Sequence, residues 1–181
     1  GRNTGGGYTP VLNDLLTTER GYPHTVENEG ISGITSAGGL QVLPTVIAAH
    51  PEAQRYLVKY GMNDARPSLP VPSGLGLNAG DVGYAGTFKA NMQNMINLIN
   101  AASEPGAPKE VVLAKINIAL GDGAFTQQYP NPDNGARSLL VKQYNQVIDE
   151  LVAIPGNNVS LAPPDFYNYF QLNSDTEYAD N

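Results

Sequence analysis

Stretches with the pattern of strands alternate with stretches of helical periodicity along this chain. Strands are predicted at residues 24–28, 55–60, 109–120 and 158–162, and helices at 10–19, 36–50, 87–102 and around 140–151. Such alternation predicts right-handed β-α-β crossovers and hence a parallel sheet. The near-continuous apolar run at 109–120 predicts a strand buried on both faces. The sequence therefore predicts an α/β fold.

The two ends of this pattern look incomplete. The chain opens on a helix, without the first strand that such sheets usually have, and it finishes on an aromatic and acidic tail without a terminal helix. A length of 181 residues corresponds to one domain by the usual relation of length to domain count. We therefore expect a single domain over residues 1–181, incomplete at both ends.

The composition argues against several classes of function. The net charge is −7 and no basic run is present, so nucleic-acid binding is not expected. No apolar stretch approaches the roughly 20 residues that span a bilayer. The chain has no cysteine, which rules out thiolate catalysis, and only two histidines, His24 and His50, so we expect neither a metal site nor a cofactor.

Two further features concern location and assembly. Charged residues make up only 15% of a chain that is rich in Asn and Tyr, which favours an exported protein, secreted or periplasmic. Nothing in the sequence indicates an oligomeric state.

The stretch RYLVKYGMNDAR, residues 55–66, predicts a short strand that runs into a tight polar turn. Gly61 ends the strand, which places Asn63 and Asp64 at the carboxyl edge of the sheet, where open α/β sheets bind ligands. The alternative is that Asn63 and Asp64 only shape a turn, because both residue types bond their own backbone well. The segment 67–84 that follows is rich in Pro and Gly without periodicity, and we expect it to flank the site.

Several segments together resemble the SGNH hydrolases, also called GDSL-type esterases and lipases. The stretch NEGISGIT resembles the family's second block and places its glycine at Gly33. The stretch YGMNDA resembles the third block, with Gly61 and Asn63 in the family's roles. The tail EYADN resembles the approach to the fourth block and places its acid at Asp180. The resemblance implies a flavodoxin-like three-layer α/β/α sandwich with a short parallel sheet.

The resemblance also implies a mechanism. In the family a serine attacks an ester carbonyl, a histidine takes its proton, and an aspartate orients the histidine. The serine N–H, the Gly33 N–H and the Asn63 side-chain amide would donate to the oxyanion, and Asp180 would be the acid. The Gly-Asp-Ser block is absent before GRNTGGGY, and the histidine would follow Asn181, so we expect the 181-residue chain alone to be inactive. We do not expect Ser32, Ser36 and His24 to form a replacement triad.

The predicted function is therefore that of a serine esterase acting through an acyl-enzyme on a small-molecule or glycan ester. An acetylated carbohydrate or a short acyl ester is preferred over a long-chain lipid, because no apolar lid-like segment is present. The alternative is a non-catalytic binding or surface module that keeps the fold. A nucleotide-binding domain is disfavoured, because no Gly-x-Gly-x-x-Gly or P-loop pattern follows a strand.

Overall fold

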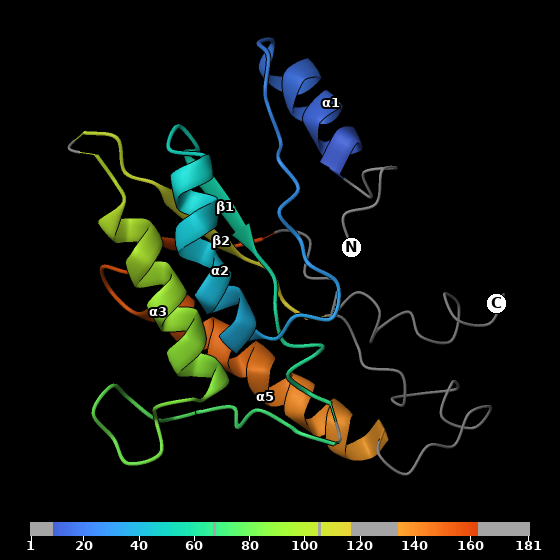
Figure 1. Ribbon diagram of the computed structural model, residues 1–181, viewed down its shortest axis with the longest axis vertical. Helices are drawn as coiled ribbons and strands as arrows, with labels where there is room; N and C mark the ends of the chain where they lie inside the picture. The colour runs from blue at the N-terminus through green and yellow to red at the C-terminus, as the bar shows by residue number, and fades with distance from the viewer. Residues whose placement is uncertain (1–8, 67, 105, 117–133, 163–181) are drawn as a thin grey trace, which may run out of the picture. The chain divides into compact units, whose positions relative to one another are not determined.

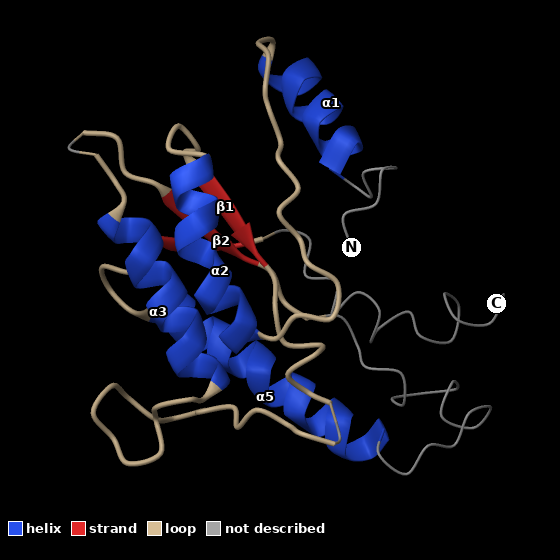
Figure 2. Ribbon diagram, in the orientation of Figure 1, coloured by secondary structure: helices blue, strands red, loops and turns tan. Residues whose placement is uncertain are grey.

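The computed structural model describes residues 9–66, 68–104, 106–116 and 134–162. It divides the chain into two compact units, Gly1–Ile34 and Thr35–Asn181. The described part of the first unit contains helix α1, Thr9–Arg20, followed by an extended loop. The second unit contains α2 (Ser36–Ala49), β1 (Arg55–Val58), α3 (Phe88–Ala101), β2 (Glu110–Leu113), α5 (Asn134–Ala153) and β3 (Val159–Leu161), as Figure 1 and Figure 2 show.

The three strands form a parallel sheet in the order β1-β2-β3. Tyr56 lies opposite Val111, and Leu113 lies opposite both Val58 and Leu161. Each crossover moves the chain one strand along the sheet in the same direction, and right-handed crossovers then place α3 and α5 on the same face. Accordingly α3 packs against both α2 and α5, so the described helices of the second unit pack side by side.

Burial alternates along β1 and β2. The buried residues of these strands are Tyr56, Val58, Val111 and Leu113. The residues that alternate with them are half-buried or exposed, and Leu57 has an exposed fraction of 44%. The prediction of a strand buried on both faces is therefore wrong for β2, since side chains of a strand alternate between faces and only one face is fully buried. The strand is also shorter than predicted: it spans Glu110–Leu113, and residues 117–120 lie outside the described part of the chain.

Two helices of the second unit, α2 and α3, begin after a threonine N-cap. The Thr35 hydroxyl accepts the N–H of Gly38 at 3.3 Å before α2, and the Thr87 hydroxyl accepts the N–H of Ala90 at 3.1 Å before α3. The backbone N–H of His50 ends α2 by donating to Val46. The helices predicted at 10–19, 36–50, 87–102 and around 140–151 are confirmed as α1, α2, α3 and α5.

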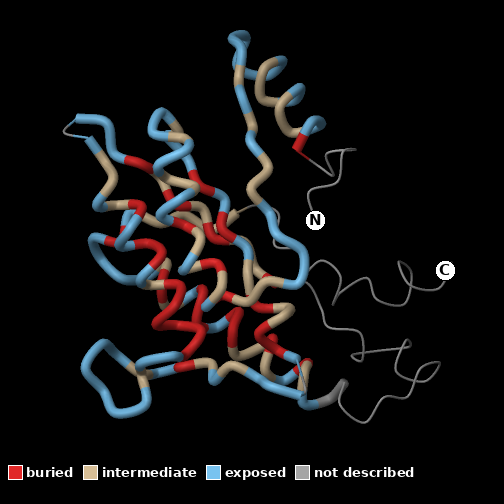
Figure 3. The backbone as a smooth tube through the Cα atoms, viewed as in Figure 1, coloured by how far each residue is buried: buried red, intermediate tan, exposed pale blue. Residues whose placement is uncertain are grey.

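The core lies between α3, α5 and the buried face of the sheet, where Figure 3 shows buried residues gathered. Its largest fully buried side chains are Tyr144, Phe88, Met92, Met95, Ile96, Ile99, Leu113, Ile116, Ile148 and Leu151. The rings of Phe88 and Tyr144 stack with centroids 4.4 Å apart, which joins the start of α3 to α5. The predicted α/β fold with a short parallel sheet is thus confirmed.

One predicted strand does not form. Residues 24–28 are loop, without a ladder to any described strand. The strands predicted at 55–60 and 158–162 are confirmed as β1 and β3, although β1 ends at Val58.

Candidate active site

Gly61 allows the chain to turn sharply after β1. Its φ of +119° lies in a region that favours glycine. A Cβ at this position would lie 2.1 Å from Cδ1 of Ile116, so the packing around Gly61 also requires glycine. The neighbouring Ile116 is itself fixed, because its N–H and C=O both bond the side-chain amide of Asn145. The turn at the carboxyl end of β1 is therefore built against the chain that leaves β2.

The next residues of this turn are held from two directions. Arg137 of α5 donates from Nη2 to the carbonyl oxygen of Met62 at 3.0 Å. The N–H of Ala65 donates to the carbonyl oxygen of Gly61 at 2.9 Å and closes the turn. Asn63 lies between these contacts and is half-buried. Its side-chain oxygen Oδ1 accepts a hydrogen bond from Nη2 of Arg66 at 3.0 Å.

Asp64 is fully buried, and its carboxylate meets the first residue of α2. Its oxygens Oδ1 and Oδ2 lie 2.9 and 3.0 Å from the backbone nitrogen of Ser36. The Ser36 hydroxyl also donates to Oδ1 and in turn accepts the amide N–H of Asn91 at 3.0 Å. A carboxylate is well placed there, because the N-terminus of a helix carries partial positive charge and unpaired N–H groups. The network joins the Asn63 turn to α2 and α3.

Two tyrosines near Asp64 are held in the protonated form. Burial raises the pKa of Tyr144 far above its usual value, and the nearby Asp64 carboxylate raises it further. The same two causes, in the same order, raise the pKa of Tyr60. The Tyr144 hydroxyl donates to the carbonyl oxygen of Val71, and the ring of Tyr60 packs where a Cβ on Gly39 of α2 would lie. Both tyrosines serve the structure around the turn as neutral groups.

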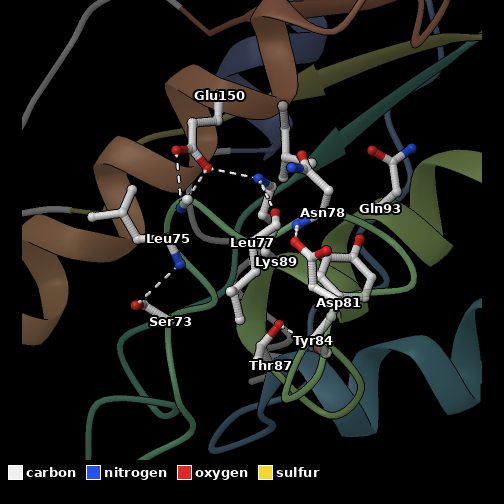
Figure 4. Close-up of polar contacts among 12 residues, drawn as sticks. Ser73, Leu75, Leu77, Asn78, Asp81, Tyr84, Thr87, Lys89, Gln93 and Glu150 are labelled. Atoms are coloured by element: carbon white, nitrogen blue, oxygen red, sulfur yellow. Dashed lines mark hydrogen bonds and ion pairs between the residues drawn. The ribbon is translucent and has the colours of Figure 1, made fainter.

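The long loop over residues 68–86 begins beside this turn, as predicted. The N–H of Val71 donates to the Asp64 carbonyl oxygen at 2.9 Å. Farther along, the Nζ of Lys89 donates to the carbonyl oxygen of Leu77 and lies 2.8 Å from Glu150 of α5. The Glu150 carboxylate also accepts the N–H of Gly76, so this pair fastens the loop to α3 and α5 (Figure 4).

The three predicted site residues fall in different parts of the chain. Asn63 lies in the second unit, on the turn just described. Gly33 lies in the first unit, exposed, with φ +77°, inside a turn in which the N–H of Ile34 donates to Ile31. Asp180 lies outside the described residues. The assignment of oxyanion donors to Gly33 and Asn63, and of the acid to Asp180, therefore stays a prediction.

The structure argues against Ser36 as a replacement nucleophile. Its side chain is fully buried, and its hydroxyl proton is donated to Asp64. His24 belongs to the first unit, where its Nδ1 lies 3.0 Å from the carbonyl oxygen of Tyr22 and its ring stacks on that tyrosine. Among the described residues, no group of three or more His, Cys, Asp or Glu side chains is placed to hold a metal ion. No helix in the described ranges is both long enough and apolar enough to cross a membrane.

Sequence reasoning missed most of the support around Asn63. The sequence indicates no role in the site for Ser36, Asn91, Arg66 and Arg137, and it predicts Asp64 either at the ligand-binding edge or as a turn residue, without its contact to α2. The one visible signal is the spacing of Asn63 and Arg66, which are three residues apart at and just after the turn. The Ser36–Asp64 contact joins positions 28 residues apart, so no local sequence pattern indicates it.

Comparison with known proteins identifies the fold. No protein-family model and no curated protein matches the chain. Among solved structures, AlinE4, an SGNH-hydrolase family esterase, superposes with a TM-score of 0.62 at 18% identity, covering 100% of this chain and 75% of that one. Two variants of AlinE4, one with a serine and one with an aspartate replaced by alanine, give TM-scores of 0.59 at the same identity and coverage. The chain therefore has the SGNH-hydrolase fold that its resemblance to that family implied.

Proposed function

We propose that the complete protein is a carboxylic ester hydrolase that works through an acyl-enzyme. The observation that carries the proposal is the placement of Asn63. Its amide follows a strand at the carboxyl end of the sheet, with its oxygen already bonded to Arg66, in a fold shared with esterases. Carboxyl ends of parallel strands are the usual ligand edge of open α/β sheets.

In this proposal the side-chain NH₂ of Asn63 and the backbone N–H of Gly33 donate to the oxyanion of the tetrahedral intermediate. An amide suits this role because it donates without carrying a charge. Asp180 holds the histidine base in the tautomer that accepts the serine proton. Residues 1–181 contain neither the family's Gly-Asp-Ser block nor its histidine block, so the proposal assigns no residue of this chain as nucleophile or base.

We further propose a small acyl group, with acetylated carbohydrates as the preferred substrate class. The loop over residues 68–86 supports this choice, because it is interrupted by two prolines and five glycines and forms no helix that could cover a long acyl chain as an apolar lid. A rate profile over aryl esters from acetate to dodecanoate tests the choice. The proposal expects the highest kcat/KM at two to four carbons, about the size of an acetyl or butyryl group, and a maximum beyond about eight carbons contradicts it.

The export of the protein, to the periplasm or the medium, remains part of the proposal. Its support is the low content of charged residues, 15%, in an acidic chain. Fractionation of the native host, followed by detection of the protein in each fraction, tests it.

The direct test of function is hydrolysis of an aryl acetate by the complete protein. Turnover that falls by about 10²–10³ in Asn63→Ala supports the esterase, because that is the usual loss for one oxyanion donor. A folded complete protein without turnover on aryl and carbohydrate acetates contradicts it and favours a binding module.

A further inference from the structure

The two ends of the Asn63 side chain have opposite effects on an oxyanion. The NH₂ end donates a hydrogen bond, whereas the oxygen end would repel negative charge. A half-turn of the amide about the Cβ–Cγ bond exchanges the positions of these two ends. An asparagine that acts as an oxyanion donor therefore needs a partner that fixes which end faces the substrate.

Arg66 is placed to select the orientation of this amide. Its Nη2 lies 3.0 Å from Oδ1 of Asn63, and Arg66 directly follows the turn that the Ala65–Gly61 bond closes. A guanidinium has donors and no acceptor, so it can pair only with the oxygen end. We propose that Arg66 is a positioning residue for the reaction: it holds the oxygen of Asn63 toward itself and so directs the NH₂ end to the oxyanion.

The charge of Arg66 adds a second effect. A hydrogen bond from a charged donor polarises the amide, which makes the N–H groups at its other end better donors. The inference rests on the proposed function of Asn63, and it deepens that function by naming the residue that orients the donor.

The backbone of the turn is held without Arg66. Met62 is bonded by Arg137, and Asp64 is bonded by Ser36, so the residues on both sides of Asn63 keep their contacts when Arg66 is removed. Arg66 itself is exposed to solvent. Loss of its side chain should therefore loosen the amide and leave the fold intact.

A double-mutant cycle in the complete protein tests this. Arg66→Ala should lower kcat for an aryl acetate about tenfold, less than the loss of the donor itself, with KM changed by less than about twofold. In the Asn63→Ala background the same change should have no further effect, because no amide remains to be oriented. Arg66→Lys should restore part of the rate, since an ammonium also only donates.

The control is Arg55→Ala, at the amino end of β1, where the exposed Arg55 pairs with Glu110 at 2.6 Å. Its kcat should match wild type. A readout that does not need turnover is the ¹⁵N signal of the Asn63 side-chain NH₂, which should shift in Arg66→Ala and stay unchanged in Arg55→Ala.

The outcomes separate the two proposals. If Asn63→Ala lowers kcat by about 10²-fold and Arg66→Ala leaves kcat unchanged, the inference about Arg66 is overturned and the proposed esterase function is kept. An equal loss from Arg66→Ala with and without Asn63 also overturns it, since Arg66 then acts elsewhere. If Asn63→Ala keeps the wild-type rate, or the complete protein has no turnover, the proposed function fails and the inference fails with it.

Discussion

The backbone nitrogen of Ser36 lies 2.9 and 3.0 Å from the two carboxylate oxygens of Asp64, so one buried side chain ties the start of α2 to the turn after β1. In this contact network Asn91 donates to Ser36 and Ser36 donates to Asp64. The direction of these bonds requires an acceptor at position 64. The Asn63 turn is therefore tied to α2 by the N–H and hydroxyl donors of Ser36.

Asp64→Asn should destabilise the fold. The NH₂ group of the new asparagine would face a donor of Ser36, either its N–H or its hydroxyl. Two donors cannot pair with each other, so buried donors would be left without an acceptor. We expect the free energy of unfolding to fall by about 2–3 kcal/mol. Urea denaturation of both proteins measures it.

Asp149→Asn is the matched control, because Asp149 is 54% exposed and pairs with Lys115 at the surface of α5. Its effect should stay within about 0.5 kcal/mol. Equal losses from Asp64→Asn and Asp149→Asn would contradict the role of the buried network.

Gly61→Ala should also destabilise the protein, for two separate reasons. The new Cβ meets Ile116 at 2.1 Å, and φ +119° strains any residue other than glycine. We expect a loss of more than about 2 kcal/mol in the free energy of unfolding. Gly83→Ala isolates the strain, since Gly83 has φ +83° and no atom within 4 Å of the added Cβ. If Gly61→Ala lowers the free energy of unfolding no more than Gly83→Ala does, the proposed clash of the added Cβ with Ile116 is contradicted.

The raised pKa of Tyr144 predicts that stability falls at alkaline pH. The neutral hydroxyl is favoured in the folded state, because burial and the Asp64 charge oppose ionisation, whereas the unfolded chain ionises at an ordinary tyrosine pKa. The stabilisation is complete below the unfolded pKa and is lost as pH rises above about 10, by about 1.4 kcal/mol per pH unit for one such group.

Chemical denaturation at pH 8 and pH 11 checks this for wild type and Tyr144→Phe. The fall in the free energy of unfolding between the two pH values should be smaller in Tyr144→Phe, because one titrating group has been removed. Identical falls in both proteins would mean that Tyr144 ionises as readily in the folded state as in the unfolded chain.

Lys89→Met should release the loop over residues 68–86. The side chain of Lys89 is only 5% exposed and joins the Leu77 carbonyl to the Glu150 carboxylate. Its loss leaves Glu150 without its cation, and we expect about 1–3 kcal/mol less stability and faster proteolytic cleavage within the loop. Arg55→Met, which breaks an exposed pair, is the control. Equal cleavage rates in the two variants would contradict the fastening role of Lys89.

The sequence predicted helices better than strands, and the reason is physical. Helix α3 shows its buried stripe directly, since Phe88, Met92, Met95 and Ile99 recur at helical spacing and all are buried. Residues 24–28 have strand-like composition, but strand formation depends on a partner, which a short segment does not encode. The length of β2 was overestimated for the same reason, since an apolar run does not mark where pairing ends.

For the site, the sequence predicted the position of the turn and not its support. Gly61, Asn63 and Asp64 stand together in the sequence and in the structure, at the end of β1. The contacts from Ser36, Asn91 and Arg137 come from three helices distant in sequence and follow only from the packing of those helices. The roles of Gly33 and Asp180 rest on the resemblance to SGNH hydrolases and stay predictions.

Stabilisation of an oxyanion by the Asn63 amide is tested by measuring kcat for an aryl acetate with the complete wild-type protein and with Asn63→Ala. We expect kcat to fall by about 10²–10³ in Asn63→Ala. The melting temperature should be unchanged, because Arg137 still bonds the Met62 carbonyl oxygen and Ser36 still bonds the Asp64 carboxylate. A rate within about threefold of wild type in a folded Asn63→Ala protein would contradict the claim.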